Sequence, residues 1–216
     1  MWDKIVKKVG LDVPTTRICC YPWDEGYVKG CAQNIVETYT NAQKDCDKPL
    51  RILLSAHGLP EKIINQGDPY QWQCEQSAAH IMKEFEKLTG IENPDWQICY
   101  QSRVGPLKWI GPSTEEALQK AADDKVGVVI LPHAFTQEHV ETLVEIEIEY
   151  REEATKMGLH DFFRVPTVGT ADVFIEGLKN LVLNNLSQNK TLSHTGVPIC
   201  PSGSKNCCMR QNNKEE

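Results

Sequence analysis

Five short apolar runs alternate with longer segments of helical periodicity, and this alternation constrains the fold more than any other feature of the sequence. The apolar runs are residues 17–21, 51–55, 97–101, 126–131 and 162–165, and the helical segments are about 25–44, 70–89, 113–124, 138–157 and 171–187. The runs at 51–55 and 126–131 are almost unbroken in hydrophobicity, which is typical of strands buried on both faces. The pattern predicts an α/β fold with a mostly parallel sheet flanked by helices on both faces.

The composition is that of an ordinary globular chain, and it disfavours three classes of protein. The chain has 216 residues, of which 40% are apolar and 25% charged, enough for one large domain or two small ones. With 23 basic against 30 acidic residues and no basic run, a nucleic-acid partner is not expected. No stretch approaches the about 20 apolar residues of a membrane-spanning helix. The opening MWDKIVKKVG is mixed and charged, unlike a secretory signal.

Polar turns rich in glycine and proline follow the predicted strands. They are the segments 56–60 (AHGLP), 102–106 (SRVGP), 132–135 (PHAF) and 166–170 (PTVGT). Ligand sites of parallel sheets lie at the carboxyl ends of the strands, so these turns predict the site edge. The sequence lacks a glycine-rich phosphate-binding loop and a G-x-S-x-G nucleophile elbow, which disfavours nucleotide binding and hydrolysis of those designs.

Titratable residues concentrate in the helical segment that follows the fourth strand. Glu141, Glu145 and Glu149 are spaced by four, so they rise along one face of a helix, and His139 lies at its beginning. Such a row suits a divalent cation or a proton relay, and the alternative is a solvated acidic face. The intervening residues are mostly apolar, which predicts a largely buried helix and favours the first interpretation.

The histidines and cysteines leave further alternatives open. His57, at the end of the most apolar strand, is either a structural hydrogen-bonding residue or a catalyst. His133 is either an additional ligand or a space-filling side chain, and we favour the second. Nine cysteines in a chain without a secretory signal indicate free thiols rather than a disulfide framework. Three of them, Cys200, Cys207 and Cys208, cluster near the end of the sequence.

Three long segments of the sequence resemble ferrochelatase, the family that inserts ferrous iron into protoporphyrin IX in the last step of protohaem synthesis. They are LLSAHGLPEKIINQGDPYQWQ (53–73), CYQSRVGPLKWIGPSTEEAL (99–118) and LPHAFTQEHVETLVEIEIEYRE (131–152). The stretches CCYPWDEGY and VPTVGT and the tail resemble alphaproteobacterial forms. The resemblance covers roughly residues 1–187 and implies the second, Rossmann-like half of a two-half chelatase fold, followed by a polar, cysteine-containing tail over 188–216.

The resemblance assigns roles to the residues of the predicted site. His57 and Glu141 are implied as catalytic and metal-binding residues that face each other across the centre of the porphyrin. Imidazole and carboxylate can together hold Fe²⁺, and a base must take the two pyrrole protons, so either residue can fill either role. The row His139, Glu145 and Glu149 is implied as a relay for protons or metal. The residues implied to line the porphyrin cleft are Gln101, Ser102, Arg103 and Trp109.

The resemblance also implies partners that the sequence itself does not supply. The first half of the family has no counterpart here, so one expectation is a separate N-terminal half. The alternative is an inactive or partner-dependent fragment that binds divalent metal or porphyrin without turnover. A chelatase acting on coproporphyrin is a lesser alternative. Because porphyrins partition into membranes, we expect a cytoplasmic protein in peripheral contact with the inner membrane.

A second metal centre is implied for the tail. Many ferrochelatases hold a two-iron, two-sulfur cluster with C-terminal cysteines, and such clusters usually need four thiolates. Cys200, Cys207 and Cys208 supply three, so the fourth is expected from elsewhere, with the missing half as one source.

Overall fold

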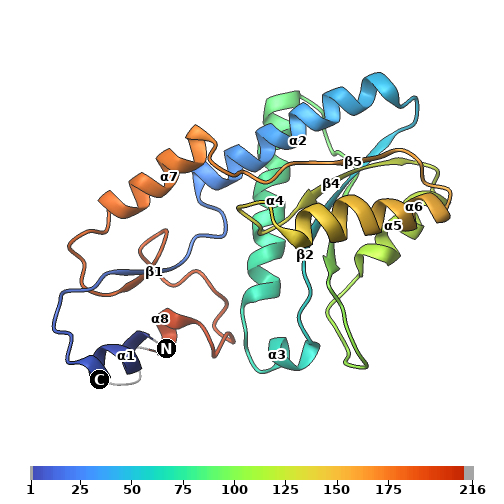
Figure 1. The fold of residues 1–216 in the computed structure, drawn as a ribbon. Coiled ribbons are helices and arrows are strands. Elements are labelled where there is room, and N and C mark those ends of the chain that lie inside the picture. Colours follow the sequence, from blue (N-terminus) through green and yellow to red (C-terminus); the bar gives the residue numbers. More distant parts are fainter. Residues whose placement is uncertain (1, 212–216) are drawn as a thin grey trace.

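A four-stranded parallel sheet forms the centre of the computed structural model, which describes residues 2–211 (Figure 1). Its strand order is β3–β2–β4–β5, with β2 over Leu50–His57, β3 over Trp96–Gln101, β4 over Gly127–Pro132 and β5 over Phe162–Arg164. In the register of the sheet, His57 lies beside Gln101 and Ser55 beside Pro132. The carboxyl ends of β2, β3 and β4 therefore meet at one edge, as the sequence predicts.

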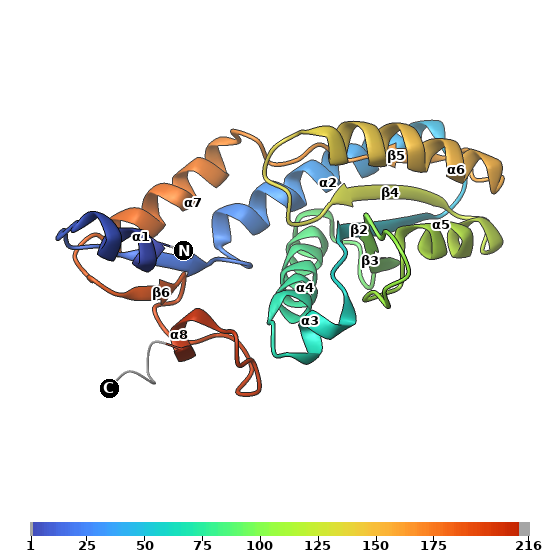
Figure 2. The same ribbon diagram turned by 60° about the horizontal axis from the view of Figure 1, so that its bottom comes forward.

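Helices cover both faces of this sheet (Figures 1 and 2). On one face lie α2 (Glu25–Asp45) and α4 (Tyr70–Thr89), and on the other lie α5 (Thr114–Asp123), η1 (Glu141–Tyr150) and α6 (Arg151–Lys156). Successive residues of β2 point to opposite faces of the sheet. Ile52 and Leu54 pack with α2 and α4, whereas Leu53 packs with α5 and η1. The prediction of a parallel sheet with helices on both faces is confirmed.

Local sequence signals set the ends of several helices. Asp24 caps α2 by accepting from the backbone N–H groups of Gly26 and Tyr27. Ser113 and Glu116 form a reciprocal capping box at the start of α5. Gly90 ends α4 at φ 71°, a left-handed conformation that glycine adopts without strain. Each of the two N-caps contributes about 1 kcal/mol to stability, so the starts of these helices are encoded locally.

The first predicted strand forms but does not join the central sheet. This strand, β1 (Arg17–Cys20), pairs in parallel with β6 (Thr191–Ser193) in a separate two-stranded sheet. Helix α7 (Asp172–Leu183) leads the chain away from β5 to β6, as Figure 1 shows. The sequence pattern did not indicate this separation, because hydrophobic periodicity identifies strands but does not say which strands pair.

A glycine contact fixes α7 against α2. A Cβ atom on Gly26 would lie 2.5 Å from the Val173 carbonyl oxygen and 2.8 Å from Gly177 Cα. A Cβ atom on Gly177 would lie 2.6 Å from Asp24 Oδ1. Since no side chain fits between them, the two helix backbones touch at this point.

Four short elements lie outside the predicted segments: α1 (Trp2–Val9), α3 (Glu61–Asn65), β6 and α8 (Cys208–Gln211). The segment after residue 188 contains β6 and α8, and the Asn206 N–H donates to the Gly67 carbonyl beside α3. Within residues 2–211, no helix is both long and apolar enough to cross a bilayer.

Candidate functional site

His57 and Glu141 face each other at the carboxyl edge of the sheet. His57 is the last residue of β2 and Glu141 the first of η1, and His57 Nε2 lies 3.7 Å from Glu141 Oε2. His57 Nδ1 lies 2.7 Å from the Gly58 carbonyl oxygen, which can only accept, so in the neutral ring Nδ1 carries the proton. The Nε2 lone pair and the carboxylate are then two acceptors facing one point, an arrangement suited to a cation or a proton.

The backbone around this pair is fixed on both sides. The Tyr70 hydroxyl donates to the His57 carbonyl at 2.9 Å. The Glu141 N–H donates to His139 Nδ1 at 3.1 Å, and the His139 ring packs edge-on against Phe135. His139 therefore lies at the start of η1 beside the pair, as the spacing predicts.

Four hydrogen bonds hold the Glu145 carboxylate, one turn into η1. The Ser102 N–H and hydroxyl donate to it at 2.8 and 2.7 Å, Gln101 Nε2 at 3.2 Å and the Tyr150 hydroxyl at 3.2 Å. Ser102, directly after β3, has φ 59°, a left-handed conformation, and its N–H points to Glu145 of η1. These contacts join Gln101, Ser102 and Glu145, all of them predicted site residues, and add Tyr150.

A buried polar chain orients Gln101. Its Oε1 accepts from the Ser55 hydroxyl at 3.0 Å, and Ser55 also bonds the Thr114 hydroxyl at 2.8 Å. The amide nitrogen of Gln101 is then directed to Glu145 and to the Glu141 carbonyl. Sequence analysis missed Ser55 and Thr114, although a serine that follows three apolar residues in a strand predicted to be buried is a signal that could have identified the first.

The helix that carries the acidic row differs from the expected α-helix. η1 is a ten-residue π-helix, in which hydrogen bonds run from i to i+5, and such segments often mark functional sites. Glu149 is exposed and makes no hydrogen bond or ion pair with any other described residue. The expectation of a largely buried helix is also wrong, because Leu143, Val144 and Ile148 are exposed.

Arg103 and Trp109 line a shallow hollow of about 300 Å³ beside the site, together with Gly105 and Leu107. Arg103 Nη1 also lies 3.5 Å from the Glu116 carboxylate. A Cβ atom on Gly58 would lie 2.8 Å from the Gln101 carbonyl oxygen and 3.3 Å from the Trp109 ring. Glycine after His57 thus allows the ends of β2 and β3 to approach each other closely.

His133 does not join the pair. It is fully buried, and its Nε2 lies 3.0 Å from the Cys74 carbonyl oxygen. Burial lowers the pKa of His133 to about 4, so the ring is neutral at physiological pH. It lines a different pocket, of about 250 Å³, which contains neither His57 nor Glu141. These observations favour the space-filling interpretation.

The tail cysteines lie beside two further cysteines of β1. Cys19 Sγ is 3.5 Å from Cys20 Sγ, and the side chains of Cys20 and Cys208 both lower the pKa of Cys19. Burial and the neighbouring Cys207 raise the pKa of Cys200 to about 11. Hydrogen bonding with Cys19 raises the pKa of Cys20, and Cys200 and Cys207 add to this rise. Hydrogen bonding with Cys20 lowers the pKa of Cys19 to about 7, which makes thiolate abundant near neutral pH. Two thiols of β1 therefore lie in the neighbourhood of the tail thiols.

The described residues form no ready metal site at either of these two places. Among the residues that the structure describes, no group of three or more His, Cys, Asp or Glu side chains is arranged to hold a metal ion. At the first site this chain brings two facing donors, His57 and Glu141.

Comparison with known proteins gives a consistent family. The ferrochelatase family model matches residues 1–186. The chain is 42% identical over 208 residues to the ferrochelatase of Pelagibacter ubique and 40% identical over 208 residues to that of Rickettsia conorii, in each case covering 95% of this chain and 58% of the relative. It is 43% identical over 193 residues to the ferrochelatase of Hyphomonas neptunium, covering 88% of this chain and 52% of the relative. These matches confirm the resemblance to alphaproteobacterial forms, and the chain spans less than two thirds of the relatives' length.

Proposed function

Since the chain belongs to the ferrochelatase family, we propose that it carries the metal-insertion half of a site that forms protohaem from ferrous iron and protoporphyrin IX. The observation that carries the proposal is the pair of acceptors, His57 Nε2 and Glu141 Oε2, 3.7 Å apart at the strand edge. Iron is the substrate here, and porphyrin would lie in the cleft beside Ser102, Arg103 and Trp109. Gln101 is fully buried, so its implied place in the cleft wall is not supported, and its side chain holds Glu145 instead.

The proposed reaction exchanges two protons for one metal ion. As Fe²⁺ enters the macrocycle, both pyrrole N–H protons leave, so the site must deliver a cation and accept protons. The imidazole lone pair and the carboxylate can each do either, and both assignments stay open. From this pair, Glu145 and His139 would pass protons or metal along η1 to the exposed Glu149.

The proposed partner corresponds to the part of the relatives that this chain does not match. Four apolar side chains of η1 and its start are exposed to solvent: Val140, Leu143, Val144 and Ile148. Exposed apolar surface of this extent commonly marks an interface. We therefore propose that an N-terminal half covers this face and closes the porphyrin cleft, and that without it the chain binds metal or porphyrin without turnover.

Anaerobic insertion of Fe²⁺ into protoporphyrin IX, followed by the loss of porphyrin fluorescence, tests the proposal. The chain alone should be compared with a fusion. In the fusion, the part of the Pelagibacter ubique relative that this chain does not match is joined to the chain. We expect turnover in the fusion and little or none in the chain alone. A folded fusion that inserts iron into neither protoporphyrin nor coproporphyrin would contradict the proposed function.

Peripheral membrane contact is proposed through α1. Trp2, Ile5 and Val9 share one exposed face, whereas Lys4, Lys7 and Lys8 share the opposite one. Basic amphipathic helices of this kind lie in the interface of anionic membranes.

Co-sedimentation with vesicles tests this contact. We expect the chain to bind vesicles that contain phosphatidylglycerol, and Ile5→Ser to weaken binding several-fold because it removes buried apolar area. Ile175→Ser on α7 is the matched control, since Ile175 and Ile5 are both 48% exposed. Equal binding by Ile5→Ser and the unmodified chain would exclude α1 as the contact.

A two-iron, two-sulfur cluster held by Cys19, Cys200, Cys207 and Cys208 is the proposed second centre. Thiolates are the ligands that such clusters require, and Cys19 is the thiol of β1 whose pKa is lowered by its neighbour Cys20 and by the tail residue Cys208. A bound cluster would supply a one-electron redox centre.

Visible absorption and EPR of the reduced, anaerobically purified protein test the cluster. We expect Cys19→Ser to abolish both signals, because it removes one of four ligands, and Cys46→Ser, a buried cysteine near the amino end of β2, to leave them unchanged. A cluster that survives Cys19→Ser would exclude Cys19 as a ligand.

A further inference from the structure

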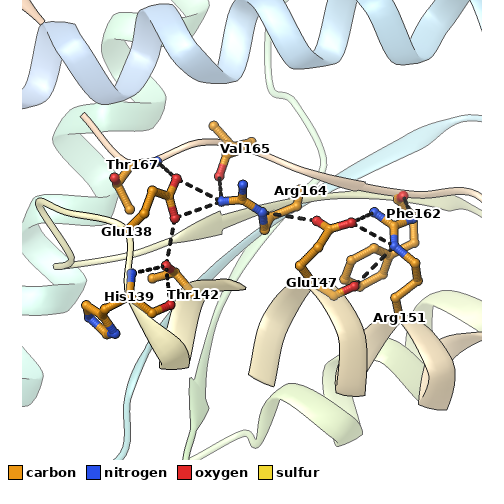
Figure 3. Close-up of polar contacts among 9 residues, drawn as sticks. All are labelled: Glu138, His139, Thr142, Glu147, Arg151, Phe162, Arg164, Val165 and Thr167. Carbon is orange, nitrogen blue, oxygen red and sulfur yellow. Dashed lines mark hydrogen bonds and ion pairs between the residues drawn. The ribbon is translucent and has the colours of Figure 1, made fainter. Parts of the chain in front are cut away.

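We propose that Arg164 is a positioning residue: by bridging Glu138 and Glu147 it holds the first turn of η1 so that Glu141 faces His57. The inference rests on the proposed function, since it assigns a residue that supports the same pair. Figure 3 shows the bridge as a row of side chains between η1 and the strand that carries Arg164.

Hydrogen bonds of the Glu138 carboxylate hold the segment that contains His139 and Glu141. Its carboxylate accepts from the Thr142 hydroxyl at 2.6 Å and from the Thr167 N–H at 2.9 Å. The Thr142 hydroxyl oxygen in turn accepts from the His139 N–H at 2.9 Å. The three residues between Glu138 and Thr142 are thus held as a closed turn, and the position of Glu141 depends on it.

Arg164 anchors this turn to the sheet. Its Nη1 lies 3.0 Å from Glu138 Oε1 and its Nε 3.0 Å from Glu147 Oε2, and Nη1 also reaches the Val165 carbonyl at 3.3 Å. The arginine is the last residue of β5, which pairs with β4. Arg164 therefore ties Glu138, which precedes η1, and Glu147, which lies within η1, to a strand of the central sheet.

Glu147 receives a second cation that reinforces the anchor. Arg151 Nε donates to Glu147 Oε1 at 3.0 Å, and Arg151 Nη1 donates to the Phe162 carbonyl of β5 at 2.6 Å. Both arginines that bind Glu147 therefore connect it to β5: Arg164 belongs to this strand, and Arg151 bonds its Phe162 carbonyl. Among the acidic residues of η1, Glu147 serves this anchor rather than the row that faces the site.

Such an anchor matters because the two facing side chains do not hold each other in place. His57 and Glu141 do not bond each other at 3.7 Å, and Glu141 has a side chain 42% exposed. A displacement of about 1 Å at a reacting centre can cost about 100-fold in rate. Burying an ion pair is often no more stabilising than an apolar contact of the same size, so the Arg164 side chain, 15% exposed, is better explained by the geometry that it fixes.

The test compares two arginines of similar design. Arg51, 10% exposed, also bridges two carboxylates, Asp95 and Asp124, but at the amino end of β2, away from the site. Two quantities should be measured for Arg164→Gln, Arg164→Lys and Arg51→Gln: amide hydrogen exchange over residues 139–143, and the affinity for Co²⁺ by calorimetry, with His57→Ala locating the site.

For Arg164→Gln we expect at least tenfold faster exchange at His139 and Thr142 and at least tenfold weaker Co²⁺ binding, with partial recovery in Arg164→Lys. Arg51→Gln should change neither. Unchanged exchange over 139–143 in folded Arg164→Gln would overturn the proposal. Should Arg164→Gln fail to fold, Glu138→Gln, which keeps the Arg164–Glu147 contact, must give the same exchange result or the proposal fails.

The two readouts separate this proposal from the proposed function. The proposed metal site fails if the unmodified chain does not bind Co²⁺, or if its Co²⁺ binding persists in His57→Ala. In either case the exchange rates still decide whether Arg164 holds the turn. If exchange accelerates but Co²⁺ affinity stays unchanged, Arg164 orders the turn without positioning the ligands, and the proposal is overturned.

Discussion

Iron insertion is expected to fall by about 100-fold or more when His57 is replaced by alanine or Glu141 by glutamine, because each change removes one of the two acceptors that face the metal path. Both side chains are about two-fifths exposed, and neither is packed in a core. The free energy of unfolding should therefore change by no more than about 0.5 kcal/mol. The measurement is the initial rate of fluorescence loss from protoporphyrin IX with Fe²⁺, in the fusion with the Pelagibacter ubique segment.

A graded effect is expected one turn farther along η1. Glu145→Gln should slow insertion by roughly tenfold, about 1.4 kcal/mol of activation free energy, because the amide keeps the shape but cannot accept from all four donors. Glu152→Gln, on the exposed side of α6, is the control and should leave the rate unchanged. A normal rate in His57→Ala or Glu141→Gln would refute the site assignment, and a normal rate in Glu145→Gln at every pH would remove the relay.

The largest loss of stability is expected from Gly177→Val, at the crossing of α2 and α7. Its Cβ would lie 2.6 Å from Asp24 Oδ1 and 2.9 Å from Gly26 Cα, so the helices must separate and the cap of α2 is disturbed. Overpacking of this kind costs about 1–3 kcal/mol, and loss of the cap adds about 1 kcal/mol. For a chain of this size, about 3 kcal/mol corresponds to a Tm lower by roughly 6–12 °C.

Thermal unfolding followed by circular dichroism measures this effect, with Gly203→Val as the matched control. Gly203 has an ordinary backbone conformation, and a Cβ atom there meets nothing within 4 Å. We expect its Tm to stay within about 2 °C of the unmodified chain. Equal melting temperatures for Gly177→Val and the unmodified chain would contradict the close contact between α2 and α7.

The central sheet could be predicted because its signals are local. The run from Arg51 to Ser55 lies within β2 and the run from Val126 to Leu131 nearly coincides with β4, since strands buried on both faces must be apolar throughout. The pairing of β1 with β6 could not be predicted in this way. Three residues, Thr191–Ser193, give too short a pattern, and their partner lies at the other end of the chain.

The candidate site could be predicted in part for the same reason. His57 follows an apolar strand and Glu141 begins a periodic helix, so local patterns place both at the strand edge. The π-helical form of η1 and the exposure of Leu143 and Ile148 depend on contacts that spacing does not encode. Arg164 was missed for a related reason: its partners Glu138 and Glu147 are 26 and 17 residues away, and only the fold brings them together.

The pairing of β1 with β6 also sets an order of assembly. Strands β2 to β5 and their helices lie between β1 and β6 in the sequence. During synthesis they emerge and can fold while β1 is still unpaired. Contacts between such distant segments form slowly, because a long loop must close first. An unpaired strand is meanwhile a template for association with other chains. We therefore expect the small sheet, and with it the meeting of Cys19 and Cys208, to be the last part of the described chain to form.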